Sequence, residues 1–107
     1  MAPTLSAELL KAKEDAKCLA KTPAPADLLD MYAFYRQAVQ EPPFESAEKP
    51  SKFALKDRAK YSAWEKVVKE GVTPEAAQTK YIDHVEGMKK TYGFDPSKEP
   101  VLWGAAA

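Results

Sequence analysis

The segment Asp27-Leu-Leu-Asp-Met-Tyr-Ala-Phe-Tyr-Arg-Gln-Ala38 is apolar around most of a helical circumference, yet one of its stripes carries Tyr32, Tyr35 and Arg36. Residues three and four positions apart are neighbours on a helix surface, so two phenols and a guanidinium are presented side by side. Arg36 is also the only basic residue in the range 22–48. The segment therefore predicts a largely buried helix with one stripe suited to aromatic stacking and phosphate recognition.

The length and charge of the chain limit what it can be. Its 107 residues correspond to one domain. Sixteen basic and sixteen acidic residues balance, so we expect no overall positive field that would recruit nucleic acid or an anionic membrane. The charge is uneven, however, because residues 49–69 hold seven basic residues against Asp57 and Glu65. A single cysteine, Cys18, excludes an intrachain disulfide and is typical of a reducing compartment.

No targeting or membrane segment is evident at the sequence level. The N-terminal residues lack the apolar run of a signal peptide, and no stretch approaches the roughly 20 apolar residues of a membrane span. We therefore expect a cytoplasmic protein without stable membrane insertion.

Proline and glycine residues divide the chain into four predicted helices. The first spans about residues 6–20, with Ser6 as its N-cap, and prolines that follow it stop the helix. The second spans about 25–40, and the third about 55–70, ending at Gly71. The fourth spans about 73–92, with Thr73 as N-cap, and ends at Gly93. Because no segment alternates like a strand, we predict an all-α four-helix bundle.

Two connecting or terminal segments complete the predicted organisation. A proline-containing loop, residues 41–53, joins the second and third helices. The tail, residues 95–107, is expected to be weakly ordered, although Trp103 offers an anchor.

Reactive side chains are scarce. The sole histidine, His84, lies off the apolar stripe of the fourth predicted helix and is expected to be a solvated surface residue. No second histidine or cysteine provides metal-ligand spacing, so no metal site is predicted. Cys18 has no evident base and is interpreted as a half-buried packing residue. The four glycines cannot form a phosphate-binding loop. Catalysis is therefore not expected.

Aromatic and cationic side chains form a more informative pattern. They are Tyr32, Tyr35 and Arg36 on the second predicted helix, Lys56 and Lys60 on the third, and Tyr81 on the fourth. Each residue alone is most simply a packing or surface residue. Together they indicate a ligand with a flat aromatic group and phosphates, since aromatic rings stack on bases and arginine binds phosphate through two parallel hydrogen bonds. A nucleotide fits this description.

Four motifs carry a resemblance to a known family. They are Leu28-Leu29-x-x-Tyr32-x-x-Tyr35-Arg36-Gln37-Ala38, Lys60-Tyr61-x-Ala63-Trp64, Ala77-x-x-x-Tyr81-Ile82-Asp83-x-Val85 and Lys90-x-Tyr92-Gly93. With these motifs the chain resembles the acyl-CoA-binding protein family from about Leu9 to Phe94. The resemblance implies one acyl-CoA-binding domain, residues 1–94, folded as a four-helix bundle of up-down-down-up topology with a long loop between the second and third helices.

The resemblance also implies a role for each matching residue. Tyr32, Tyr35 and Arg36 would hold the adenine and the ribose 3′-phosphate, and Lys60 would help to clamp that phosphate. Lys17 and Lys56 correspond to other ligand-contacting lysines, and Tyr81 to a tyrosine at the adenine end. Leu28 and Leu29 would line the groove for the acyl chain. The implied protein is a monomeric carrier and buffer of long-chain acyl-CoA, with no cofactor, no nucleic-acid partner and no catalytic activity.

The chain departs from the family pattern at several positions. Arg36 replaces a usual lysine, so a planar fork replaces a point charge. Tyr61 occupies the position of a tryptophan, and Lys13 that of a small apolar residue near the acyl chain. The glycine that usually follows the second helix is absent, and the next loop is about two residues longer than usual. Two alternatives remain: a helical protein-interaction module without acyl-CoA binding, and an acyl-CoA thioesterase, which the missing base and nucleophile disfavour.

Overall fold

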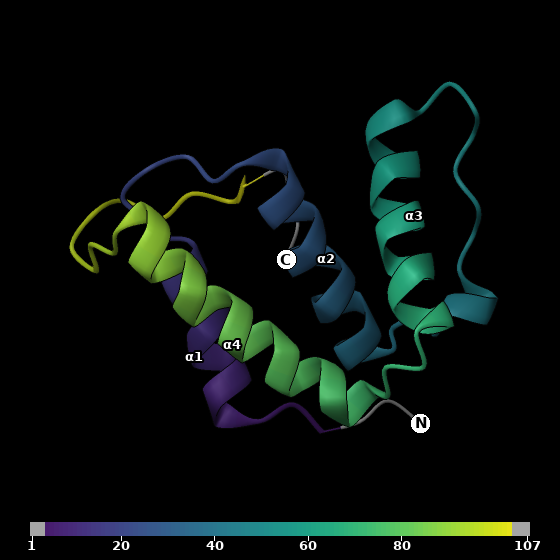
Figure 1. The fold of residues 1–107 in the computed structure, drawn as a ribbon, viewed down its shortest axis with the longest axis horizontal. Helices are drawn as coiled ribbons and strands as arrows, with labels where there is room; N and C mark the ends of the chain where they lie inside the picture. The colour runs from purple at the N-terminus through teal and green to yellow at the C-terminus, as the bar shows by residue number, and fades with distance from the viewer. Residues whose placement is uncertain (1–3, 104–107) are drawn as a thin grey trace.

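The computed structural model describes residues 4–103 and has the predicted all-α architecture. Its elements are α1 (Ala7–Ala16), α2 (Pro25–Val39), the short 3₁₀ turn η1 (Phe44–Ser46), α3 (Leu55–Lys69) and α4 (Pro74–Tyr92). In Figure 1, α1 and α4 run in one direction and α2 and α3 in the other, which is the up-down-down-up topology. The long connection between α2 and α3 runs back alongside α3 to reach its N-terminal end.

The second helix lies at the centre of this arrangement. Both α3 and α4 pack extensively against α2, whereas α1 packs against α4. The third helix consequently stands to one side of the other three (Figure 1). The fold is therefore a three-helix body, formed by α1, α2 and α4, with α3 attached through α2.

Local signals at the helix ends act as the sequence predicts. The Ser6 hydroxyl oxygen accepts a hydrogen bond from the Leu9 amide at 3.1 Å, and the Thr73 hydroxyl oxygen accepts one from the Ala76 amide at 3.1 Å. Both bonds satisfy amides that have no partner inside the helix. At the other end of α4, Gly93 has a φ of +82°, a conformation that L side chains rarely adopt.

The predicted end of the first helix is wrong, because α1 ends at Ala16 and not at Ala20. The next residues pair with the segment that follows α4 instead. The Ala20 amide donates to the Gly93 carbonyl at 2.9 Å, and the Asp95 amide donates to the Cys18 carbonyl at 3.0 Å. This non-local pairing also buries Leu19 completely. Cys18 itself is half-buried, as predicted.

The described part of the tail packs on the C-terminal end of α1. The Val101 amide donates to the Lys17 carbonyl at 2.8 Å, and the Trp103 indole N–H donates to the Ala16 carbonyl at 2.7 Å. Carbonyls at the end of a helix lack partners within that helix, so the tail supplies donors that would otherwise come from water. Residues 104–107 lie outside the described residues.

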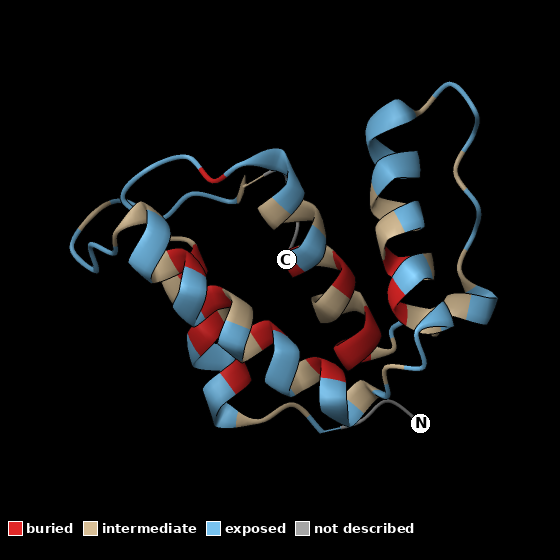
Figure 2. Cartoon of the chain, in the orientation of Figure 1, coloured by how far each residue is buried: buried red, intermediate tan, exposed pale blue. Residues whose placement is uncertain are grey.

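Most of the core lies between α1, α2 and α4. Figure 2 shows buried residues on the sides of these helices that face one another. The largest completely buried side chains in this cluster are Leu9, Leu19, Tyr81 and Val85. An ion pair adds to the α1–α4 contact: the Lys89 ammonium lies 2.5 Å from the Asp15 carboxylate. Burial raises the pKa of Asp15, but hydrogen bonds and charges from Lys89 and Lys11 outweigh this effect, and the net pKa is lowered.

A second, smaller cluster attaches α3 to α2. It consists of Ala33, Trp64 and Val67. A buried glutamine reinforces it, because the Gln37 carbonyl oxygen accepts a hydrogen bond from the Trp64 indole N–H at 3.1 Å. The amide nitrogen of Gln37 donates to the Val72 carbonyl at 2.8 Å. One side chain of α2 thus bonds both to α3 and to the turn that leads into α4.

Replacement of this glutamine tests its structural role. We predict that Gln37→Ala lowers the free energy of unfolding by about 2–4 kcal/mol, because it leaves the buried Trp64 N–H and the half-buried Val72 carbonyl without these partners. Urea denaturation followed by circular dichroism measures the change. Gln78→Ala is the matched control, since Gln78 bonds to Ser6 and Thr4 near the surface. An equal loss in both variants would contradict a special role for Gln37.

Candidate functional site

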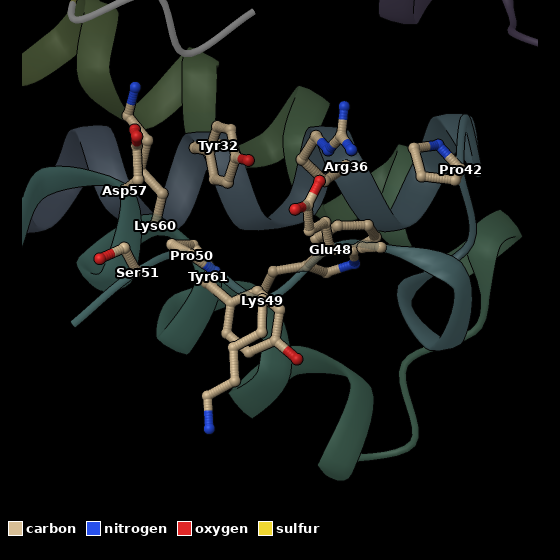
Figure 3. Close-up of a pocket in the computed structure, with 12 residues that line it drawn as sticks. Tyr32, Arg36, Pro42, Glu48, Lys49, Pro50, Ser51, Asp57, Lys60 and Tyr61 are labelled. Atoms are coloured by element: carbon tan, nitrogen blue, oxygen red, sulfur yellow. The ribbon is translucent and has the colours of Figure 1, made fainter. Parts of the chain in front are cut away.

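A cavity of about 420 Å³ lies between α2, α3 and the loop that joins them. Figure 3 shows Tyr32 and Arg36 one helical turn apart on α2, with side chains of α3 and of the loop around the same space. The lining residues are Tyr32 and Arg36 from α2, Pro42, Ala47, Glu48, Lys49, Pro50 and Ser51 from the loop, and Asp57, Lys60, Tyr61 and Trp64 from α3.

Cations and aromatic rings alternate along this cavity. The Arg36 guanidinium carbon lies 4.7 Å from the ring centroid of Trp64, and the Lys60 ammonium lies 5.5 Å from that of Tyr32. Both distances are typical of cation–π contacts. The Arg36 Nε atom is buried and has no hydrogen-bond partner in the structure. The arrangement offers flat rings for stacking and cations for an anion within one space.

A second aromatic group extends from α2 toward α1 and α4. The Lys13 ammonium donates to the Tyr35 hydroxyl at 3.0 Å, and the rings of Tyr35 and Tyr81 lie 5.7 Å apart. Sequence reasoning identified Lys13 only as a departure from a family pattern and missed this contact. No local signal could reveal it, because it depends on how α1 packs against α2.

Tyr81 lies in the core and has no solvent-exposed surface. Its hydroxyl has no hydrogen-bond partner, which is unusual for a buried phenol. Burial raises the pKa of Tyr81 strongly, and the neighbouring Tyr35 and Glu14 add to the shift. Tyr81 therefore remains neutral, and its ring packs against the Tyr35 ring from the core.

Two predicted ligand lysines lie outside the cavity. Lys17 is half-buried at the end of α1, and its ammonium forms an ion pair with Glu14 at 2.9 Å. Lys56 is exposed in the first turn of α3 and does not line the cavity, although Lys60 on the same helix does. The structure thus brings Tyr32, Arg36 and Lys60 together, and it places Lys17 and Lys56 elsewhere.

The two predicted groove residues are half-buried. Leu28 packs against the main core cluster. Leu29 lines a separate hollow of about 310 Å³ between α2 and α3. Apolar neighbours of Leu29 in this hollow are Ala26, Phe34, Ala63 and Val67.

Several cavity residues were not among the predicted ligand-binding residues. Tyr61 was noted only because tyrosine replaces a tryptophan, yet it lines the cavity beside Lys60, and its ring lies 5.0 Å from that of Phe44. Trp64 was quoted within a motif without a role at the ligand. The motif spacing on α3 could have identified both, whereas Glu48 and its loop neighbours carried no such signal.

The prediction for His84 is wrong, because this histidine is not a solvated surface residue. It is half-buried, and its Nε2 atom lies 2.8 Å from the Asp27 carbonyl oxygen, so we assign the proton to Nε2. Its ring meets the Phe34 ring edge-on at 5.9 Å. Possible ligand atoms of His84, Asp27 and Asp30 lie within 4.8 Å of one another, and the Tyr92 hydroxyl donates to the Asp27 carboxylate. These bonds give the group a structural role in joining α4 to α2.

Comparison with known sequences and structures places this geometry in a family. The sequence model described as "Acyl CoA binding protein" matches residues 6–85. The chain belongs to the acyl-CoA-binding protein family. Within the described residues, no helix is long and apolar enough to cross a membrane.

Individual family members are similar over most of the chain. An acyl-CoA-binding protein homolog of Drosophila melanogaster is 36% identical over 88 residues, which cover 82% of this chain and 98% of that protein. An acyl-CoA-binding protein of Brassica napus is 38% identical over 75 residues, which cover 70% of this chain and 77% of that protein. The crystal structure of Oryza sativa acyl-CoA-binding protein 2 superposes with a TM-score of 0.70 at 34% identity, covering 86% of this chain and 96% of that one.

The unpartnered hydroxyl of Tyr81 leads to a stability prediction. We expect Tyr81→Phe to leave the free energy of unfolding unchanged or to raise it by about 1 kcal/mol, because the lost hydroxyl makes no hydrogen bond. Tyr92→Phe is the matched control, since its hydroxyl bonds to both Asp27 and Ala24. That variant is expected to lose about 1 kcal/mol in urea denaturation. Equal losses would mean that the Tyr81 hydroxyl has a partner.

Proposed function

We propose that the protein binds long-chain fatty acyl-CoA esters reversibly and carries them without chemical turnover. The observation that carries this proposal is the cavity in which Tyr32, Arg36 and Lys60 converge, in a chain that belongs to the acyl-CoA-binding protein family. Its members named above are acyl-CoA-binding proteins or homologs of them.

In this proposal the charged head group lies in the 420 Å³ cavity. Arg36 and Lys60 bind the 3′-phosphate, and the buried Nε of Arg36 is a donor that a phosphate oxygen would satisfy. The adenine stacks on the phenol ring of Tyr32, which lines the cavity. Tyr35, which packs against Tyr81, would contribute from the next turn of α2 at the edge of this site. Lys17 and Lys56 contribute longer-range attraction to the phosphates.

The acyl chain lies along α2 in the proposed complex. Leu28 and Leu29 provide apolar surface there, and the hollow beside Leu29 is lined by further apolar side chains. Burial of each methylene group is worth about 0.8 kcal/mol. A long acyl chain therefore accounts for most of the difference in affinity between an acyl-CoA and free CoA.

The proposed role is binding alone, and it is supported by the position of the candidate reactive side chains outside the cavity. The imidazole of His84 is held by the Asp27 carbonyl and by Phe34. Cys18 is half-buried, and its backbone bonds to Asp15 and Asp95. Neither side chain lines the cavity.

Calorimetric titration tests the function directly. Palmitoyl-CoA is expected to bind with a submicromolar dissociation constant, far more tightly than free CoA, because only the ester buries an acyl chain. The same mixtures, analysed by liquid chromatography, are expected to contain no steadily increasing free CoA. No binding of either compound would overturn the proposal, and steady release of CoA would favour a thioesterase.

The phosphate role of Arg36 gives a second test. We predict that Arg36→Ala weakens acyl-CoA binding by about 1.5–3 kcal/mol, through loss of a charge-assisted hydrogen bond. The loss should be much smaller for the 3′-dephospho ligand. Arg58→Ala is the matched control, because Arg58 is on α3 but does not line the cavity. Arg36→Lys, which keeps the charge, should recover part of the affinity. Equal losses with both ligands would refute the phosphate contact.

A further inference from the structure

The last described residues, Val101, Leu102 and Trp103, cross the C-terminal end of α1, and we call them the tail strap. The Trp103 indole N–H and the Val101 amide fasten the strap by donating to the carbonyls of Ala16 and Lys17. Figure 1 shows the tail returning from α4 to the N-terminal end of α2. The match to the family model ends at residue 85, so the strap adds a surface that the matched region does not include.

The tail strap closes a hollow between α1 and α2, in which only about 10 Å³ remains open. Ala16 and Met31 line this hollow, and both are buried. Lys13 and Lys17 line it as well, while their ammonium groups are engaged in hydrogen bonds with other side chains. Lysine stems lie readily on apolar surface when their charged ends have polar partners. The strap therefore covers a mainly apolar surface on the side of α2 that faces α1.

The outer side of the strap is apolar and accessible. Leu102 is 62% exposed and Val101 is 37% exposed, whereas the half-buried Trp103 packs against the main core. Anchoring of the strap thus accounts for Trp103 but not for Leu102. On α2, Leu28 lies three residues before Met31, and residues at this spacing are neighbours on a helix surface. A chain that lies along α2 at Leu28 would meet the strap within one helical turn.

We propose that the tail strap forms a wall of the acyl-chain groove and strengthens the preference of the protein for long acyl chains. This inference rests on the proposed function. The head-group cavity lies on the side of α2 that faces α3, and no strap residue lines it. A short acyl chain ends before it crosses α2 to the strap. A long chain continues past Leu28 and covers the exposed face of Leu102, so the strap adds affinity only through the far carbons of the chain.

Calorimetric titration of the full chain with octanoyl-CoA and palmitoyl-CoA tests the proposal. Leu102→Ser should weaken palmitoyl-CoA binding about tenfold and change octanoyl-CoA binding by less than about twofold, because only the longer chain covers this leucine. Leu10→Ser, at a position that is 49% exposed on α1 and outside the hollow, is the matched control. It should bind both compounds as the unchanged protein does.

A second variant tests the strap as a unit. Trp103→Ala removes the hydrogen bond to the Ala16 carbonyl and part of the contact with the core. We expect it to weaken palmitoyl-CoA binding at least as much as Leu102→Ser does. Circular dichroism checks that both variants fold, and an unchanged affinity for octanoyl-CoA checks that the head-group site is intact.

Three results would overturn the proposal. Equal weakening of both compounds would show that the strap does not act through chain length. Unchanged palmitoyl-CoA binding in both variants would leave the acyl chain in the hollow beside Leu29 alone. Tighter palmitoyl-CoA binding in either variant would mean that the strap competes with the chain. Failure of the unchanged protein to bind palmitoyl-CoA would instead refute the proposed function, and this inference with it.

Discussion

The bond between Gln37 and the Trp64 indole is the interaction on which the position of α3, and with it the cavity, depends. Gln37 lies on the central helix, and through its two amide atoms it holds α3 and the turn before α4 in place. The same indole ring carries the Arg36 guanidinium on its face. Trp64 therefore contributes both to the packing of α3 against α2 and to the candidate site, because its ring also lines the cavity.

This shared tryptophan explains why arginine is suited to position 36. A planar guanidinium can lie against an indole and still direct N–H groups outward, whereas a lysine ammonium offers a single point charge. The contact with the Trp64 ring thus restrains the orientation of the Arg36 guanidinium in the structure without a ligand. A site whose cation is already oriented loses less entropy on binding than one that must order a flexible side chain.

Local patterns in the sequence predicted most of the fold and some of the residues that line the candidate site. Caps at Ser6 and Thr73 and the glycine at position 93 act within a few residues of one helix, so they could be recognised directly. Tyr32 and Arg36 were recognised because they share one face of one helix. The early end of α1, the contact of Lys13 with Tyr35 and the bond of His84 to α2 were missed. Each of these depends on a partner that is distant in sequence.

The attachment of α3 through one small apolar cluster has a consequence for motion. Separating α3 from α2 exposes only Ala33, Trp64, Val67 and their immediate neighbours, whereas disrupting the body exposes the whole main core. Local unfolding that costs less than global unfolding defines an independent cooperative unit. We expect α3 to be such a unit. A molecule that contacts both Arg36 on α2 and Lys60 on α3 would hold α3 against the three-helix body. Binding of such a molecule would therefore slow amide hydrogen exchange in α3, a helix that otherwise opens at a low free-energy cost.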